Sequence, residues 1–119
     1  MVYPSHYAKG FLGYENPALY PYEVVKYSIE NAASRVLAHG ISHMKNGTTT
    51  AASSSISLSD LYASSPVPLA RIRPWLQAFD IGATYDAEKI KAQIRASEEG
   101  GAVGYMLWSP SNIYASYAE

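Results

Sequence analysis

The chain of 119 residues carries nine Lys and Arg against ten Asp and Glu, which gives a formal net charge of −1 with the histidines neutral, and it contains no cysteine. This balance shows no electrostatic footprint for nucleic acid or an anionic membrane, and the missing thiols exclude disulfides and thiolate metal sites. A hydrophobic share of 48% with 16% charged residues is typical of one globular domain, and no apolar run approaches the roughly 20 residues that span a bilayer.

The first predicted elements are a strand over residues 1–7 and, after a loop rich in Gly, Pro and Asn, a helix. Pro21 fits the first turn of this helix, where its missing N–H is not needed. Apolar side chains then recur at helical spacing over 22–39, and Gly40 is predicted to end the helix. No basic and apolar leader precedes the first strand, so we expect either a cytoplasmic protein or a chain that begins within a longer polypeptide.

The middle of the chain changes character twice. Residues 45–65 are rich in Ser, Thr and Ala with few large apolar groups, which predicts a low-complexity insertion or a flexible loop at the surface. Residues 71–79 then alternate, with small aliphatic side chains on one face and Trp75, Gln77 and Phe79 on the other. This alternation predicts a strand with one face under a helix and the other towards the mouth of a barrel.

A second helix and a third strand complete the predicted elements. The helix is predicted over 87–99, with Asp86 as its N-cap and a hydrophobic staple between Tyr85 and Ile90. Residues 102–108 form a nearly continuous apolar run, as expected for a strand buried on both sides. Strands that alternate with covering helices predict an α/β fold of about three parallel strands and two main helices. A closed (β/α)8 barrel needs about 250 residues, so these units cannot close one.

Three segments together carry a resemblance to a known family. They are 1–7 (MVYPSHY) followed by Gly10-Phe11 and Pro21-Tyr22, 73–79 (RPWLQAF), and 104–112 (GYMLWSPSN) with Tyr114. Their order and spacing resemble a glycoside hydrolase domain family of unknown function, a (β/α)8 family of bacterial extracellular and envelope proteins, although the Ser/Thr-rich excursion is longer than the family's usual connection. The resemblance implies a partial TIM barrel, with 1–119 as a single C-terminal fragment that holds the sixth, seventh and eighth strands. It also implies that this chain lacks the first five strands and an acidic residue that the family carries a few positions before Met1, and that the parent protein is extracellular or attached to the cell envelope.

Acidic residues are scarce where a glycosidase needs them. Most glycosidases place two carboxyl groups about 5 Å apart for retention and about 6.5–9.5 Å apart for inversion. In this chain most acidic residues fall on or beside the outer helices, and only Glu15 and Asp80 follow strands. Asp80 is a weak catalytic candidate, because a turn-forming role before Gly82 explains it better. We therefore expect the chain to lack the catalytic acid pair, and its own enzymatic activity stays open.

The histidines offer alternatives that the sequence leaves open. His6 lies at a strand end, where it either binds substrate or stabilises the loop. His39 and His43 have the i, i+4 spacing of metal ligands only if the helix runs through Gly40. No metal site and no cofactor is predicted.

Tyrosine is unusually frequent, with 11 copies beside two Phe and two Trp. Its flat apolar ring with a hydrogen-bonding tip suits a partly wet cleft that binds a flat polar ligand such as a sugar. The candidate substrate-binding residues lie at or near the ends of the predicted strands: Tyr3, His6, Tyr7, Trp75, Gln77, Phe79, Trp108 and Asn112. The alternative is that the tyrosines occupy loops and that both tryptophans fill the interior of the barrel.

Three functional hypotheses follow. In the first, the parent protein hydrolyses a glycosidic bond in a polysaccharide, and this C-terminal portion supplies residues of the substrate cleft. In the second, the chain is a non-catalytic module that binds carbohydrate, or that associates through unpaired strand edges with the remainder of the barrel or another copy of itself. In the third, the chain is a truncated gene product without a function of its own.

Overall fold

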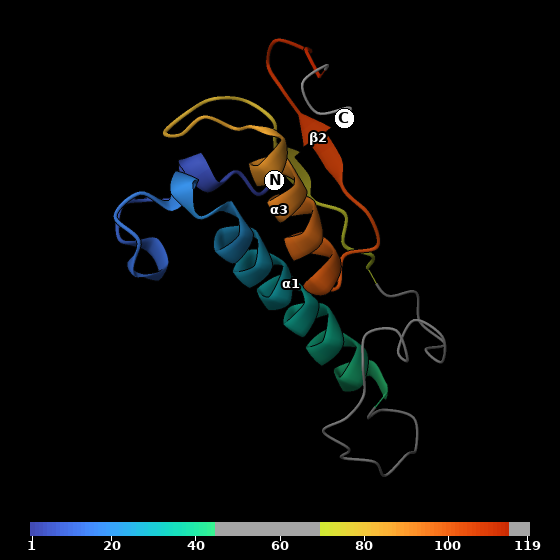
Figure 1. Cartoon of the computed structure of the whole chain (residues 1–119). Coiled ribbons are helices and arrows are strands. Elements are labelled where there is room, and N and C mark those ends of the chain that lie inside the picture. Colours follow the sequence, from blue (N-terminus) through green and yellow to red (C-terminus); the bar gives the residue numbers. More distant parts are fainter. Residues whose placement is uncertain (45–69, 115–119) are drawn as a thin grey trace.

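The computed structural model describes residues 1–44 and 70–114, and its elements follow the chain from blue to red in Figure 1. They are the 3-10 turns η1 (Pro4–His6), η2 (Phe11–Gly13) and η3 (Pro17–Leu19), the helices α1 (Pro21–Met44) and α3 (Ala87–Glu99), and the strands β1 (Trp75–Gln77) and β2 (Met106–Trp108). Within these residues the fold is mixed α/β with a parallel sheet, as the sequence predicts. The predicted insertion over 45–65 falls outside the described residues.

Helix α1 is longer than its sequence signals indicate. Pro21 opens it, as predicted, and Val25 and Ile29 are buried on its inner face. The predicted end at Gly40 is wrong, since the helix continues to Met44. Gly40 lies inside the helix and is buried, and its low helix propensity costs only about 1 kcal/mol relative to Ala.

The strand predicted over 1–7 is reduced to a single residue. Val2 forms a parallel bridge to Leu76, and its N–H donates to the carbonyl of Trp75 at 2.9 Å. Pro4 then opens η1, and because proline has no N–H to give to a ladder, the chain leaves the sheet there. The opposite edge of β1 pairs with β2 in this register: Trp75↔Met106, Leu76↔Leu107 and Gln77↔Trp108.

The other two strands are also shorter than predicted. β1 starts only after Pro74, whose carbonyl accepts the N–H of Met106 at 2.9 Å. β2 covers the last three of the residues 102–108, because Ala102 belongs to the turn behind α3 and donates its N–H to the carbonyl of Ser97 at 2.9 Å. β2 is not buried on both sides as predicted: Trp108 is exposed, since helices cover only one face of the sheet.

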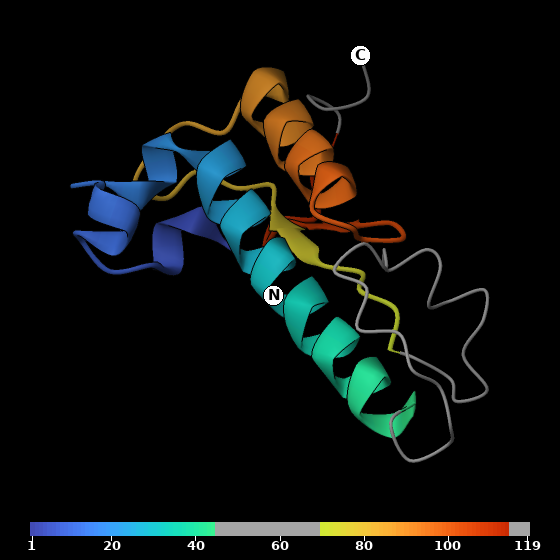
Figure 2. The same ribbon diagram turned by 90° about the horizontal axis from the view of Figure 1, so that it is seen from below.

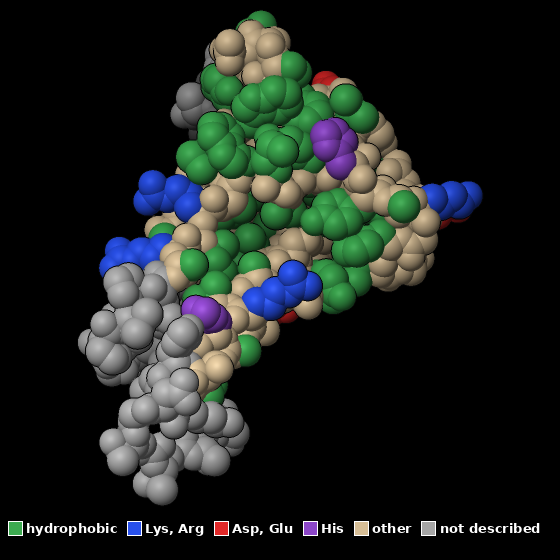
Figure 3. All heavy atoms as spheres, turned by 180° about the vertical axis from the view of Figure 1, so that it is seen from behind, with side chains coloured by type: hydrophobic (Ala, Val, Ile, Leu, Met, Phe, Trp, Pro, Cys, Tyr) green, Lys and Arg blue, Asp and Glu red, His purple; other side chains and the backbone are tan. Residues whose placement is uncertain are grey.

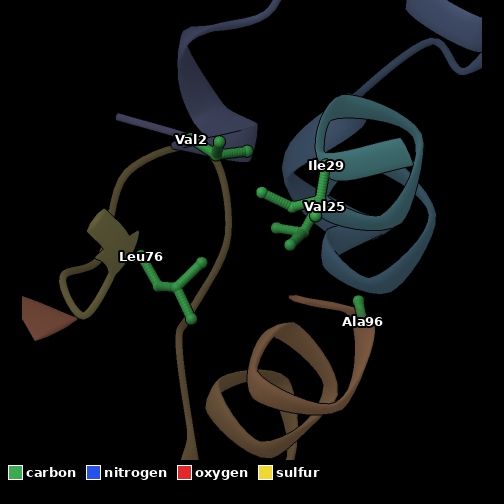
Figure 4. Close-up of a cluster of buried hydrophobic side chains, with 5 residues drawn as sticks. All are labelled: Val2, Val25, Ile29, Leu76 and Ala96. Atoms are coloured by element: carbon green, nitrogen blue, oxygen red, sulfur yellow. The ribbon is translucent and has the colours of Figure 1, made fainter. Parts of the chain in front are cut away.

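Both helices lie on the same side of the sheet, as Figures 1 and 2 show. They approach each other closely at Gly100, because a Cβ on this residue would lie 2.9 Å from the Cβ of Ile29. Between the helices and the sheet lies the main buried cluster, drawn in Figure 4: Val2, Val25, Ile29, Leu76 and Ala96. Fully burying a side chain of this aliphatic kind stabilises a fold by roughly 1.5–3 kcal/mol, so this layer holds the structure together.

The start of α3 follows its predicted signals. The Oδ1 of Asp86 accepts the N–H of Lys89 at 3.0 Å, which confirms Asp86 as the N-cap. Tyr85 and Ile90 pack in a second buried cluster, and the Tyr85 hydroxyl donates to the carbonyl of Ala18 at 3.0 Å. Burial raises the pKa of Tyr85 above its ordinary value, so the phenol stays a donor. This bond ties the loop before α1 to the loop before α3.

Candidate functional site

Alternate residues of the sheet point away from the helices. Val2, Leu76 and Leu107 belong to the cluster under the helices, so their neighbours along each segment face the opposite side. We name this side the open face and define it by these residues: Tyr3, Trp75, Gln77, Phe79, Met106 and Trp108. Figure 3, which shows the molecule from behind the helices, shows hydrophobic side chains gathered there.

Three rings pack together at the C-terminal ends of the parallel segments. Tyr3 stacks on Trp108 with ring centroids 5.7 Å apart and planes inclined by 21°. Phe79 meets both rings edge-on, at 5.3 Å from Trp108 and 5.5 Å from Tyr3. His6 lies 5.3 Å from Tyr3 and 6.2 Å from Phe79. Burial, and then the nearby Tyr114, raise the pKa of Tyr3, so its phenol stays neutral.

An open apolar hollow of about 400 Å³ lies beside these rings, and we name it the aromatic hollow; it is lined by Met1, Tyr3, His6, Trp75 and Trp108. Tyr3 is buried, whereas Trp75 is 39% exposed and Trp108 is 37% exposed, so both indoles present ring surface to solvent. Trp75 begins β1 instead of ending it, which corrects its predicted position. Over the described residues, the lining of the hollow includes no Lys, Arg, Asp or Glu side chain.

Gln77 belongs to the open face but is fully buried. Its Oε1 accepts the N–H of Ser5 at 3.1 Å and the Ser5 hydroxyl at 2.8 Å. Its Nε2 donates to the carbonyl of Phe79 at 3.0 Å. Both polar atoms of the side chain are therefore engaged within the chain, and the geometry gives Gln77 a positioning role. It fastens η1, which carries His6, to the end of β1.

Gln93 of α3 completes this support, although the sequence patterns did not single it out. Its Oε1 accepts the N–H of Gln77 at 3.1 Å, and its Nε2 donates to the carbonyl of Gln77 at 2.8 Å. These bonds satisfy the backbone of β1 where the N-terminal segment has left the sheet. The spacing could have predicted that Gln93 is buried, because Ile90, Gln93 and Ser97 stand at i, i+3 and i+7 and so share one face of the helix. All three are buried.

A protein-family model described as "Putative glycosyl hydrolase domain" matches residues 1–114. The chain belongs to this family. The match spans the aromatic hollow and the helices behind the sheet, and it confirms the family resemblance carried by the three sequence segments. A comparison with curated proteins found no match, and a comparison with solved structures found none either.

Two predicted binding residues of the chain lie away from the aromatic hollow. Tyr7 packs against Phe11 with ring centroids 4.4 Å apart, and its hydroxyl is 2.8 Å from the Oγ of Ser28. Asn112 is exposed and has a φ of 55°, and its N–H donates to the carbonyl of Ser109 at 3.2 Å. Asn tolerates this left-handed conformation, which suits the turn after β2. Neither residue lines the hollow.

The acidic candidates of the chain have local partners. The Oδ1 of Asp80 accepts the N–H of Tyr85 at 2.7 Å and closes the loop before α3, which agrees with the turn-forming role. Glu15 forms an exposed ion pair with Lys9. In the part of the chain that the structure describes, no residue lining the aromatic hollow is acidic. The hollow can receive a flat apolar ring, but it supplies no carboxyl group.

The histidine pair of α1 requires a correction. Because the helix runs through Gly40, His39 and His43 do have helical i, i+4 spacing. Among the side chains that the structure describes, those of residues 1–42 and 70–114, no group of three or more His, Cys, Asp or Glu could hold a metal ion. Within the same residues, no helix combines the length and the apolar character that a membrane crossing needs.

Proposed function

We propose that the chain is the carbohydrate-contacting part of a glycosidase domain, built as a segment of a (β/α)8 barrel. The segment at Val2, β1 and β2 run parallel, with helices over one face and aromatic side chains on the other. A barrel wall has this organisation: helices cover its outside, and the C-terminal ends of its strands carry the active site. The aromatic hollow, which runs along the open face from Trp75 at the start of β1 to Trp108 at the end of β2, is the observation that carries the proposal.

The aromatic hollow suits a neutral pyranose ring. An exposed indole offers a flat apolar surface to the C–H groups on one face of a sugar, and Trp75 and Trp108 both offer this surface. Tyr3 and Phe79 hold the Trp108 ring in place, so little side-chain freedom is lost on binding. The exposed imidazole of His6 lies at the hollow and can exchange a hydrogen bond with a sugar hydroxyl.

Cleavage of the glycosidic bond requires two carboxyl groups beside the sugar. Asp80 is engaged with the backbone of Tyr85, and Glu15 is paired with Lys9 at the surface. We therefore place the acid pair elsewhere in the parent domain, where this chain supplies residues of the substrate cleft. A polysaccharide outside the cell or in its envelope is the substrate class that the family resemblance favours.

Tryptophan fluorescence tests this proposal directly, because the chain has only two tryptophans and both line the aromatic hollow. Titration with neutral gluco- and galacto-oligosaccharides should change the emission of the 119-residue chain. Trp108→Ala should weaken binding at least tenfold, a loss of about 1.4 kcal/mol, with Trp75 as the remaining reporter. Ile81→Ala removes an exposed apolar side chain that does not line the hollow, so it should bind like the wild type. The proposal is wrong if no oligosaccharide changes the emission or if Trp108→Ala binds undiminished.

Self-association is a second candidate function, and the outer edge of β2 favours it. β2 pairs with β1 on one side, and among the described residues no strand lies on its other side. Tyr105, just before this strand, and Trp108 at its end are both exposed. An unpaired, apolar strand edge invites another strand, either from a second copy or from the remainder of a barrel. Analytical ultracentrifugation should show association that grows with concentration; a folded chain that stays monomeric would contradict this candidate.

A further inference from the structure

A second hollow of the molecule lies between the loop around η2 and the outer surface of α1. Its volume is about 480 Å³, and its lining runs from Tyr7 and Phe11 to Tyr27, Asn31 and Arg35. We name it the α1 groove. It shares no lining residue with the aromatic hollow, so the two can be tested separately.

One end of the α1 groove is an aromatic wall that is already in place. Phe11 packs on Tyr7 at 4.4 Å and meets Tyr27 edge-on at 5.7 Å. The Ser28 hydroxyl donates to the carbonyl of Val24 at 2.8 Å, so the Tyr7 hydroxyl is the donor in its 2.8 Å bond to Ser28. This bond fixes the Tyr7 ring, while Tyr27 keeps 45% of its surface exposed.

The other end of the α1 groove carries a positive charge. Asn31 donates one N–H to the carbonyl of Tyr27 at 2.8 Å, which leaves its second N–H for a ligand. Arg35 follows one turn later, and none of the ion pairs within the described residues involves it. A guanidinium is a planar fork of donors that matches a carboxylate. Tyr27 and Arg35 are separated by a rise of about 12 Å, the span of about two pyranose rings.

We propose that the α1 groove binds an acidic saccharide, with a pyranose ring against Phe11 and Tyr27 and a carboxylate on Arg35 and Asn31. The Arg35 guanidinium distinguishes this site from the aromatic hollow, whose lining includes no Lys or Arg side chain. The inference adds a second site to the proposed function and rests on that function only for the choice of a sugar as ligand. Binding of a charged group at an exposed site weakens as salt is added.

Amide chemical shifts of the isotope-labelled 119-residue chain test the groove. Digalacturonate and cellobiouronate are the acidic probes, and galactobiose and cellobiose are their neutral counterparts. At least one acidic disaccharide should shift amides between Tyr27 and Arg35 and bind about tenfold more tightly than its neutral counterpart, because a charge-assisted pair exceeds a neutral hydrogen bond. Arg35→Gln should abolish this preference, and Phe11→Ala should weaken both members of the pair. The proposal fails if neither acid shifts these amides, or if Arg35→Gln retains the preference.

Two control variants keep this result apart from that of the aromatic hollow. Arg95→Gln removes the same charge from an exposed residue of α3 and should leave binding of the acidic disaccharide unchanged. Trp108→Ala should also leave it unchanged, while it reduces neutral oligosaccharide binding. If Trp108→Ala abolished binding of the acidic sugar, the ligand would occupy the aromatic hollow, and the α1 groove proposal would be wrong. Neutral oligosaccharide binding that Trp108→Ala left undiminished, with the acidic disaccharide still bound, would instead contradict only the proposed function.

Discussion

The two faces of the sheet are made from the same short strands, yet one carries aliphatic side chains and the other mainly aromatic ones. Towards the helices the sheet presents Val2, Leu76 and Leu107, which are aliphatic and packed against α1 and α3. Towards the open side it presents mainly aromatic rings, several of them in contact with solvent. The difference reflects what lies opposite each face: close-packed helices require shapes that interdigitate, whereas an uncovered face can keep broad flat rings.

This contrast shows how the chain separates stability from binding. In a strand, neighbouring residues point to opposite faces, so one position can serve the core and the next can serve a ligand. Trp75 and Leu76 are such neighbours: the first lines the aromatic hollow, and the second is fully buried under the helices. Substitutions one residue apart should therefore change different properties of the molecule.

The largest expected effect comes from the face of the sheet under the helices, which presents Val2, Leu76 and Leu107 and which we name the closed face. Leu76→Ala should lower the free energy of unfolding by about 3 kcal/mol, because it leaves a cavity in the main buried cluster. Trp75→Ala should lower it by only about 1 kcal/mol, since the indole is already 39% exposed. Urea unfolding followed by circular dichroism measures both values.

Binding of neutral oligosaccharides supplies the complementary measurement. Trp75→Ala should weaken binding, whereas Leu76→Ala should bind like the wild type under conditions where it stays folded, because its side chain does not reach the aromatic hollow. Equal losses of stability for the two variants would show that the two faces are not separated in this way.

The helices could be predicted more fully than the strands, and local chemistry explains why. The limits of α3 depend on Asp86 and the glycine after Glu99, which act within one turn of the helix. The strands depend on partners far along the chain, so their lengths could not be obtained from periodicity. The N-terminal segment shows this: Val2 pairs with Leu76, but Pro4 turns the chain out of the sheet.

The same distinction applies to the candidate site. Alternation within the sequence placed Trp75 and Phe79 on the aromatic side, and the structure brings Tyr3, His6 and Trp108 to the same place. Alternation could not predict what the side chains of Gln77 and Gln93 bind. Whether a polar residue binds a ligand or the chain itself depends on its partners, and Gln77 bonds to Ser5, 72 positions away. The roles of these residues towards a sugar stay predictions.

A smaller effect is expected from the junction between the two faces, where Gln93 holds the backbone of β1. Gln93→Leu keeps the size of the side chain but removes both hydrogen bonds to Gln77. Two buried backbone groups then lack partners, which should lower the free energy of unfolding by about 2 kcal/mol. Lys91→Leu, on the exposed side of the same helix, is the control and should change stability by less than about 0.5 kcal/mol. If Gln93→Leu were as stable as this control, the side chain would not support the strand.

The smallest effect is expected at the rim of the closed face, where Asp86 caps α3. The N–H of Lys89 first, and then the Lys89 charge, lower the pKa of the Asp86 carboxyl. A depressed pKa in the folded state gives stability that is present above the carboxyl's ordinary pKa, near 4, and is lost as the pH falls through the lowered value. Asp86→Asn keeps an N-capping side chain but cannot titrate there.

The free energy of unfolding of the wild type minus that of Asp86→Asn should therefore stay constant from neutral pH down to about pH 4. Below that pH this difference should fall, because the wild type loses the stability that the ionised carboxyl provides. Urea unfolding at about pH 7 and about pH 2.5 measures this change, and a difference that does not vary with pH would contradict the assigned cap. Asp86 does not line the aromatic hollow, so the variant should bind neutral oligosaccharides like the wild type at pH 7. A change in that affinity would mean that helix capping on the closed face reaches the rings of the open face, and the separation of stability from binding would not hold.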